Sequence, residues 1–177
     1  MRLPLLALLA TSGLLAQDFA APKPTSHHLA LLRQVGTWDA EVRVFMAPGK
    51  PPAVSKGVQV NKLVPGGLWL TSEFKSDMLG MPFEGRGIFG YDTAAGKHVG
   101  TWVDSMVTGL ALPVGSCKDD CRETTLTFDG PGMDGKTVTY REVTVEKGPD
   151  ATLMTMYIKD KDGAFVRNLE IAYTRRK

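Results

Sequence analysis

The sequence predicts an all-β chain that closes into an up-and-down antiparallel β-barrel of about 8–10 strands with a short N-terminal helix. Three observations support this. Short runs of alternating apolar and polar residues follow one another along most of the chain, turns rich in Gly and Pro separate them, and helical spacing occurs only near the start. A long twisted sheet loses its unpaired edges by closing, so we expect a barrel.

The first residues predict a signal peptide over residues 1–16. Met1 and Arg2 give a positive start, residues 3–16 are apolar, and the small Ala16 precedes the polar Gln17. The apolar run is shorter than the roughly 20 residues that cross a bilayer. We therefore expect cleavage near Ala16, or alternatively near residues 20–21, and no membrane span in the mature protein. A flexible lead-in, 17–26, then precedes a barrel domain, 27–177, that is secreted or periplasmic.

The N-terminal helix is expected over residues 27–34, with Thr25 and Ser26 as candidate caps. Apolar residues recur there at helical spacing. From Thr37 onward the period changes to two, because Trp38 and the apolar residues at 40, 42, 44 and 46 alternate with polar ones. This alternation predicts a half-buried first strand that ends at the Pro- and Gly-rich residues 48–52.

The same alternation predicts the remaining strands, each closed by Gly, Pro or Asp. They are 54–64, 68–77, 83–91, 97–106, a shorter strand up to 115, 123–129, 136–146, 151–159 and 164–175. The glycine-rich residues 83–92 superficially resemble a phosphate loop. No helical pattern follows to supply an N-terminal dipole, so a bending strand is expected there.

The charges and cysteines narrow the function classes. The formal net charge is +2 and the basic residues are scattered, so nucleic-acid binding is not expected. In an exported chain Cys117 and Cys121 predict a disulfide across a short loop, stabilising by about 2 kcal/mol. The alternative is a metal site, but no further Cys or His cluster lies nearby in the sequence to complete four ligands.

A Gly-x-Trp at the start of the first strand is shared with lipocalin-like barrels, which this chain resembles through Gly36 and Trp38. In lipocalins the indole plugs the closed end of the barrel and an Arg from the last strand packs over it. Arg175 is in phase with the apolar face of the last predicted strand, so we expect a cation–π contact of about 1–2 kcal/mol with Trp38. The alternative is that Arg175 and Arg176 are both solvated.

A wider pattern resembles the bacterial DUF1579 family of uncharacterised proteins. It consists of His28, Leu31, Gly36-Thr-Trp38, Pro65-Gly-Gly67, residues 83–92, Thr101-Trp-Val-Asp-Ser105, Thr108-Gly109 and Ile171-Ala-Tyr-Thr-Arg175. The resemblance implies a lipocalin-like barrel over the mature chain and brings no established catalytic residues. Nitrobindin-like haem barrels share the architecture. Because no His follows His98 to reach a haem, no cofactor is expected.

A candidate site begins with Trp102, Asp104 and Met106, which share one face of a predicted strand. If that face is inward, Asp104 is a carboxylate among apolar neighbours, suited to acid–base chemistry or to anchoring a ligand. Partners that could complete a polar cluster are Glu73, Glu84, Arg86, Tyr91 and Arg141. The alternative, which we favour, is a structural ion pair at the barrel rim.

The favoured function is binding of a small apolar or amphipathic ligand inside the barrel. Trp102, Met106, Phe74, Phe89, Met154 and Met156 would line the site. A structural or partner-binding envelope protein is the second hypothesis. A small-molecule enzyme that uses Asp104 with Arg86 or Arg141 is the third, so catalysis is not expected. Nothing in the sequence predicts the oligomeric state.

Overall fold

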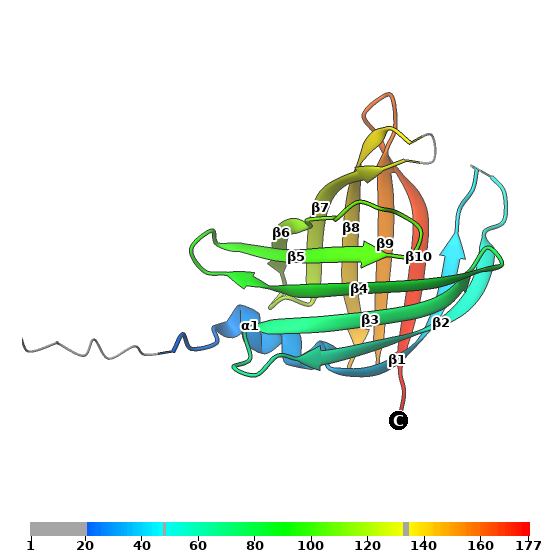
Figure 1. Cartoon of the computed structure of the whole chain (residues 1–177). Coiled ribbons are helices and arrows are strands. Elements are labelled where there is room, and N and C mark those ends of the chain that lie inside the picture. The colour runs from blue at the N-terminus through cyan, green and yellow to red at the C-terminus, as the bar shows by residue number, and fades with distance from the viewer. Residues whose placement is uncertain (1–20, 48, 133–134) are drawn as a thin grey trace, which may run out of the picture.

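The computed structural model describes residues 21–47, 49–132 and 135–177. The predicted signal peptide and residues 17–20 of the predicted lead-in lie outside these residues. Within them, a short helical segment precedes ten strands (Figure 1). No helix in the described part is long and apolar enough to cross a membrane.

The elements follow one another with short connections. They are α1 (Ser26–Ala30), the 3₁₀ turn η1 (Leu31–Gln34), β1 (Gly36–Val44), β2 (Ala53–Leu63), β3 (Trp69–Met78), β4 (Met81–Asp92), β5 (Lys97–Asp104), β6 (Val114–Lys118), β7 (Glu123–Pro131), β8 (Thr137–Gly148), β9 (Ala151–Lys159) and β10 (Phe165–Arg175). Nine of the predicted strands have counterparts whose ends shift by a few residues. The short strand predicted up to residue 115 is displaced, because β6 begins at Val114 and extends into the predicted cysteine loop as far as Lys118.

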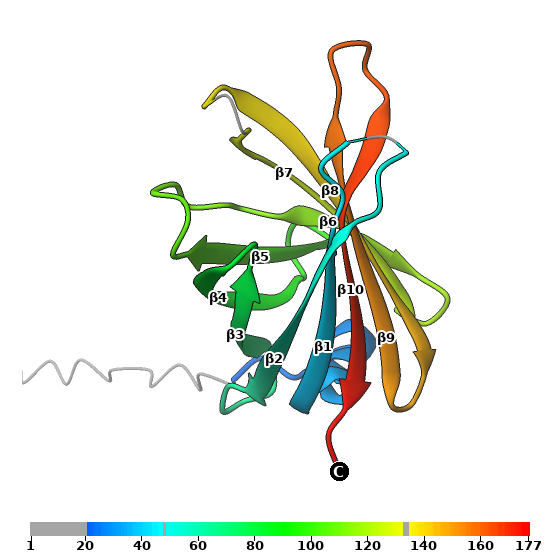
Figure 2. The same ribbon diagram turned by 90° about the vertical axis from the view of Figure 1, so that its right-hand side faces the viewer.

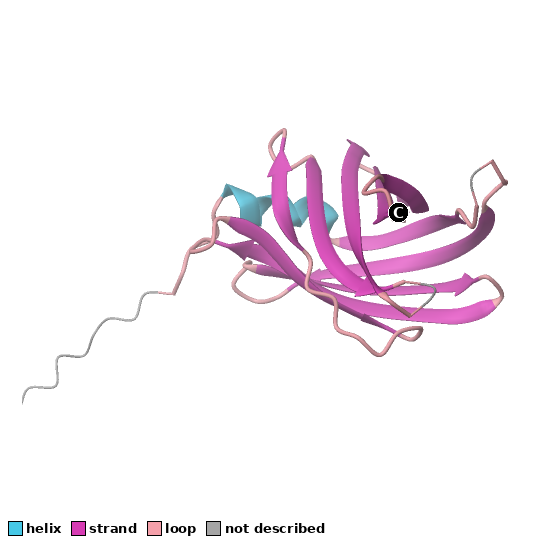
Figure 3. Cartoon of the chain, turned by 90° about the horizontal axis from the view of Figure 1, so that it is seen from above, coloured by secondary structure: helices cyan, strands magenta, loops and turns pink. Residues whose placement is uncertain are grey.

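The sheet closes into a barrel, which confirms the predicted fold class. Each strand pairs antiparallel with its sequence neighbours, and β1 pairs with β10 to complete the ring. The closing register sets Trp38 opposite Arg175 and Val44 opposite Leu169. Figures 2 and 3 show the strands curving around a common interior, with the helical segment at one end.

We call this end, where β1 begins and β10 finishes, the closed end. Trp38 is buried there, and its indole N–H donates to the Gln34 carbonyl at 2.9 Å. The guanidinium of Arg175 lies 4.0 Å from the centre of the Trp38 ring and donates to the carbonyls of Arg33 and Val35. A Cβ on Gly36 would come within 2.9 Å of that guanidinium, so the glycine leaves room for the plug.

The apolar core occupies one wall of the barrel interior. Ala40, Val42, Phe74, Phe83 and Ile171 are buried together, from strands β1, β3, β4 and β10. The period-two pattern of β1 produces this wall directly, because Trp38, Ala40 and Val42 point inward while the residues between them face solvent. The rest of the interior surrounds a cavity.

Candidate functional site

The cavity inside the barrel has a volume of about 720 Å³. This is within the range of sites that hold small molecules. Its lining is mostly aromatic and aliphatic. Its large apolar and aromatic side chains include Phe74, Phe83, Phe89, Trp102, Phe128, Tyr140, Met154, Met156, Leu169 and Tyr173.

Two polar side chains interrupt this lining, Glu142 on β8 and Tyr173 on β10, and we call this pair the polar pole. Glu142 and Tyr173 both face the cavity, and the Thr144 hydroxyl donates to the Glu142 carboxyl at 3.2 Å. Burial raises the pKa of Glu142, and the Thr144 hydrogen bond opposes that change. Burial also raises the pKa of Tyr173, and the nearby Glu142 carboxylate adds to the increase. The pole therefore favours neutral, hydrogen-bonding groups over charges.

Trp102 and Asp104 lie toward the other end of the cavity. The Trp102 indole N–H donates to one Asp104 oxygen at 3.1 Å, and the backbone N–H groups of Met106 and Val107 donate to the other at 2.8 and 3.2 Å. The Trp102 ring lies over Gly85, where a Cβ would overlap it. Asp104 thus orients the indole and caps the turn that ends β5, two residues before the predicted strand end.

Residues 105–113, which we call the rim loop, run back beside β5 at the cavity. Ala111 exchanges backbone hydrogen bonds with Trp102, and Val107, Leu110 and Ala111 contribute to the cavity lining. Leu110 and Leu112 are each 56% exposed, and Met106 is 45% exposed. The rim loop therefore presents apolar side chains both to the cavity and to solvent.

The other candidate residues are spread over both faces of the barrel. Glu73 and Arg86 are opposite one another on β3 and β4, on exposed positions of the outer face. Arg141 also lies outside the cavity, with its guanidinium 5.0 Å from the Tyr157 ring centre and 4.1 Å from that of Phe165. None of these three side chains lines the cavity with Asp104.

Tyr91 lies at the closed end, where it packs against two histidines. Its ring is stacked on His27 at 4.0 Å between centroids and meets His98 edge-on at 5.1 Å. His28 has a different environment. Its Nδ1 accepts from the Thr25 backbone N–H at 3.0 Å, and the side chain is buried.

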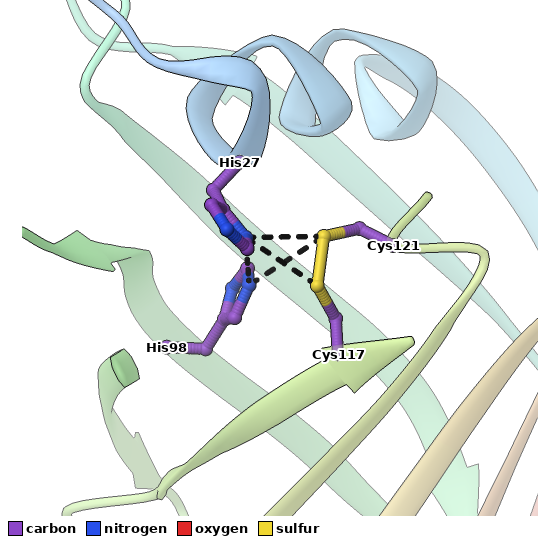
Figure 4. Close-up of side chains that lie close together, drawn as sticks. All are labelled: His27, His98, Cys117 and Cys121. Atoms are coloured by element: carbon purple, nitrogen blue, oxygen red, sulfur yellow. Dashed lines mark hydrogen bonds between the residues drawn. A yellow bond between two sulfur atoms is a disulfide. The ribbon is translucent and has the colours of Figure 1, made fainter. Parts of the chain in front are cut away.

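His27 and His98 converge on the cysteine pair (Figure 4). Cys117 and Cys121 form a disulfide. The His27 Nδ1 lies 3.4 Å from the Cys117 sulfur and 3.3 Å from the Cys121 sulfur. The His98 Nε2 lies 3.2 Å from His27 Nδ1 and 3.7 Å from the Cys121 sulfur. Burial, followed by the charges of His27 and His28, lowers the pKa of His98.

Sequence reasoning missed this cluster, which we call the His–Cys cluster. It found no ligands near Cys117 and Cys121 along the chain, yet His27 and His98 reach them from positions 90 and 23 residues away. The fold brings them together because β5 begins, and the β6–β7 loop turns, at the same end of the barrel as α1 (Figure 1). Arg33 reinforces this meeting point, since it binds both the Glu146 carboxylate and the Asp120 carbonyl.

The amino-acid sequence matches the family described as "Protein of unknown function (DUF1579)" over residues 23–175. The chain belongs to the DUF1579 family. No curated protein sequence matches this DUF1579 chain significantly.

Two solved structures show the same fold at low sequence identity. One is the S-type phycobiliprotein lyase CPES from Guillardia theta, with 11% identity and a TM-score of 0.58, covering 86% of this chain and 94% of the lyase. The other is Rv2717c from M. tuberculosis, with 14% identity and a TM-score of 0.62, covering 88% of this chain and 100% of Rv2717c. At these identities the likeness of the DUF1579 chain to both extends to the barrel fold.

Proposed function

We propose that this DUF1579 barrel binds one small apolar or amphipathic molecule in its interior. The observation that supports this proposal is the cavity itself, about 720 Å³ in volume, whose lining includes many aromatic, aliphatic and methionine side chains. A barrel evolved for stability alone fills its interior, because protein cores pack to the density of organic crystals. An apolar cavity of this size instead favours a guest with little charge.

The polar pole favours an amphipathic guest. Glu142 and Tyr173 lie together on the wall, and burial shifts the pKa of each upward, toward the neutral form that can donate a hydrogen bond. A carbonyl, hydroxyl or ether oxygen of the guest would accept from them, while its apolar part contacts Phe74, Met154 and Met156. Buried hydrogen bonds of this kind orient a ligand inside an otherwise apolar site.

The rim loop offers a route of entry. Strands β5 and β6 share only two register pairs, His98 with Gly115 and Val99 with Val114. Along the rest of β5 the rim loop takes the place of a paired strand. Its exposed Leu110 and Leu112 would meet an apolar guest before it enters. The same exposed residues are what a partner-binding protein would use, and this is the observation that favours that second function.

The enzyme hypothesis has less support. Both oxygens of Asp104 already accept hydrogen bonds from Trp102 and from the turn after β5. Arg86 and Arg141, the cations considered as its partners, lie outside the cavity.

We also propose that the protein is exported, as its first 16 residues suggest. The disulfide between Cys117 and Cys121 supports an oxidising compartment. Cell fractionation with intact-mass measurement tests this, and a full-length chain retained in the cytosol would contradict it.

The binding proposal is tested with anilinonaphthalene sulfonate, an amphipathic fluorescent probe. We expect saturable fluorescence enhancement at one probe per chain. Met156→Trp places an indole in the cavity, and Tyr157→Trp places one on the outer face of the same strand as the matched control. Overpacking costs about 1–3 kcal/mol, so Met156→Trp should weaken probe binding by about tenfold or more. Equal affinities for both variants, or no saturable binding by the unmodified protein, would contradict a ligand site in the cavity.

A further inference from the structure

The His–Cys cluster has the ligand types of a metal site. Two sulfurs and two imidazole nitrogens, one atom from each residue, all lie within 4.8 Å of one another. Tetrahedral sites with two cysteine and two histidine ligands are typical of structural zinc. In the oxidised protein the sulfurs are bonded to each other, so neither is available as a thiolate.

The distances between the ligand atoms match a tetrahedron along most of its edges. With metal–nitrogen distances of about 2.0 Å and metal–sulfur distances of about 2.3 Å, two nitrogens lie about 3.3 Å apart and nitrogen and sulfur about 3.5 Å apart. Here the two imidazole nitrogens are 3.2 Å apart. The nitrogen–sulfur distances are 3.4 Å and 3.3 Å from His27 and 3.7 Å from His98 to Cys121. Two edges remain. The one between the sulfurs must lengthen, since the disulfide bond holds them together, and the one between His98 Nε2 and the Cys117 sulfur lies within 4.8 Å.

The imidazoles are held in place by contacts that do not depend on the sulfurs. Tyr91 stacks flat on His27 and meets His98 edge-on. His98 is only 7% exposed, and it sits on a strand paired to both neighbours. Preorganised ligands of this kind favour metal binding, because little side-chain freedom is lost when the ion arrives.

We propose that, once Cys117 and Cys121 are reduced, their thiolates together with His27 Nδ1 and His98 Nε2 bind one Zn²⁺ ion in a tetrahedral site. A dithiol reduces the disulfide: it transfers two electrons and two protons to the pair, which becomes two thiols, and is itself oxidised to a disulfide. Binding of Zn²⁺ then displaces the two thiol protons into solvent. With four protein ligands the ion has no open position, so its role is structural.

A metal ion in this site would link three separate parts of the fold. His27 belongs to α1, His98 to β5, and the cysteines to β6 and the β6–β7 loop. The disulfide joins β6 only to the loop that follows it, whereas the metal would also link α1 and β5 to them. The closed end would therefore have two forms. In the oxidised form α1 is held by packing contacts of His27, and in the reduced form the metal ion would bind His27 as well. This inference does not depend on the ligand proposed for the cavity.

The test uses the protein expressed from its full-length sequence, reduced with a dithiol and desalted without oxygen. We expect it to retain one equivalent of Zn²⁺ and to melt at a higher temperature with the metal than without it. Co²⁺ should give thiolate-to-metal charge-transfer absorption and the strong visible bands of a tetrahedral site. The protein with its disulfide intact should do neither.

Variants separate a four-ligand site from binding by the thiols alone. We expect His27→Gln and His98→Gln to weaken Zn²⁺ binding by more than the 10–100-fold that loss of an outer-shell partner typically costs. Removal of both cysteines, Cys117→Ser with Cys121→Ser, should abolish it. Tyr91→Phe is the matched control, since it keeps the ring on His27 and removes no proposed ligand.

Circular dichroism checks that each variant is folded, and His27, on the partly exposed α1, gives a readout should the buried His98 prove intolerant of change. No retained Zn²⁺ in the reduced protein would overturn the proposal. Equal Zn²⁺ affinity and an unchanged Co²⁺ spectrum in folded His27→Gln would overturn it as well.

Discussion

Glu142 faces the barrel interior beside Tyr173, and its hydrogen-bond partner among the described residues is the Thr144 hydroxyl. An ionised carboxylate there loses hydration that one hydroxyl does not replace, which is why burial raises its pKa. The charge state of this residue is therefore coupled to folding.

The Glu142 pKa predicts how stability depends on pH. Because the folded-state pKa lies above the unfolded value of about 4.3, the unfolded chain releases the Glu142 proton first as pH rises. This carboxyl's contribution to the free energy of unfolding therefore decreases as pH rises from the unfolded pKa to the folded pKa. At higher pH the contribution stays low. Glu142→Gln removes that contribution, so the variant should gain stability relative to the unmodified protein as pH rises.

Urea unfolding over a pH series measures the effect, with the exposed Glu84→Gln as the control. Glu84 is paired with Lys75 on the outer face, and that partner lowers its pKa. Its substitution should change the pH dependence in the opposite direction or negligibly. Parallel pH profiles for Glu142→Gln and the unmodified protein would mean that Glu142 titrates as it does in water.

At the residue scale, the alternation of apolar and polar residues predicts which face of a strand some site residues occupy. It gives no such prediction where both faces of a strand are apolar. On β4, Gly85 and Gly87 alternate with Arg86, and the glycines take the inner face because Trp102 fills the space beside them. This pattern contains enough information to place Arg86 outside. On β8 the outward Val143 and Val145 are as apolar as any inner residue, so alternation alone does not assign a face to Arg141.

The strands as elements follow closely from the sequence, because turns rich in Gly, Pro and Asp separate runs of clear period two. β9 has the predicted bounds, 151–159, and β10 starts one residue late. β5 ends at Asp104 rather than at 106, since the Asp104 side chain caps the following turn. β6 has five residues, the shortest of the ten strands, and only a strand of uncertain extent was predicted before residue 115.

Close packing of β6 against β7 yields a prediction about Gly115. A Cβ at this position would overlap the Thr125 carbonyl, which is backbone and cannot rotate away. We expect Gly115→Ala to lower the free energy of unfolding by about 1–3 kcal/mol or more. Gly109→Ala in the rim loop is the control, because nothing lies within 4 Å of its Cβ and its φ is not positive. Similar urea midpoints for the two variants would show that β6 moves freely against β7.

At the scale of the whole molecule, closure depends on one long-range pairing, between β1 and β10. The sequence predicts that the sheet closes, since ten strands in meander order leave two edges that must otherwise stay unpaired. It does not predict what closure brings together. The His–Cys cluster joins residues from α1, β5 and the β6–β7 loop, and no local pattern encodes that meeting, because it depends on where each strand begins along the barrel axis.

The closing pair also brings the two ends of the barrel domain together. The backbone N–H of Arg176 donates to the Thr37 carbonyl at 2.8 Å, directly beside the start of β1. Ends this close predict that the barrel tolerates circular permutation. A Gly/Ser linker of about 12 residues spans roughly 20 Å, enough to join the end of β10 to the residues before α1.

The permutant with new ends in the β9–β10 turn, between Lys161 and Asp162, should therefore fold. This turn is exposed, and opening it disturbs only local contacts, namely hydrogen bonds to Asp160 and the ion pair between Lys161 and Asp162. Every strand pair of the ring survives, so thermal unfolding should stay cooperative and probe binding in the cavity should persist. Opening the chain instead between Ser72 and Glu73 interrupts β3, which pairs on both sides, and this control should not fold. If both permutants fold equally well, closure of the ring by β1 and β10 is not what holds the barrel together.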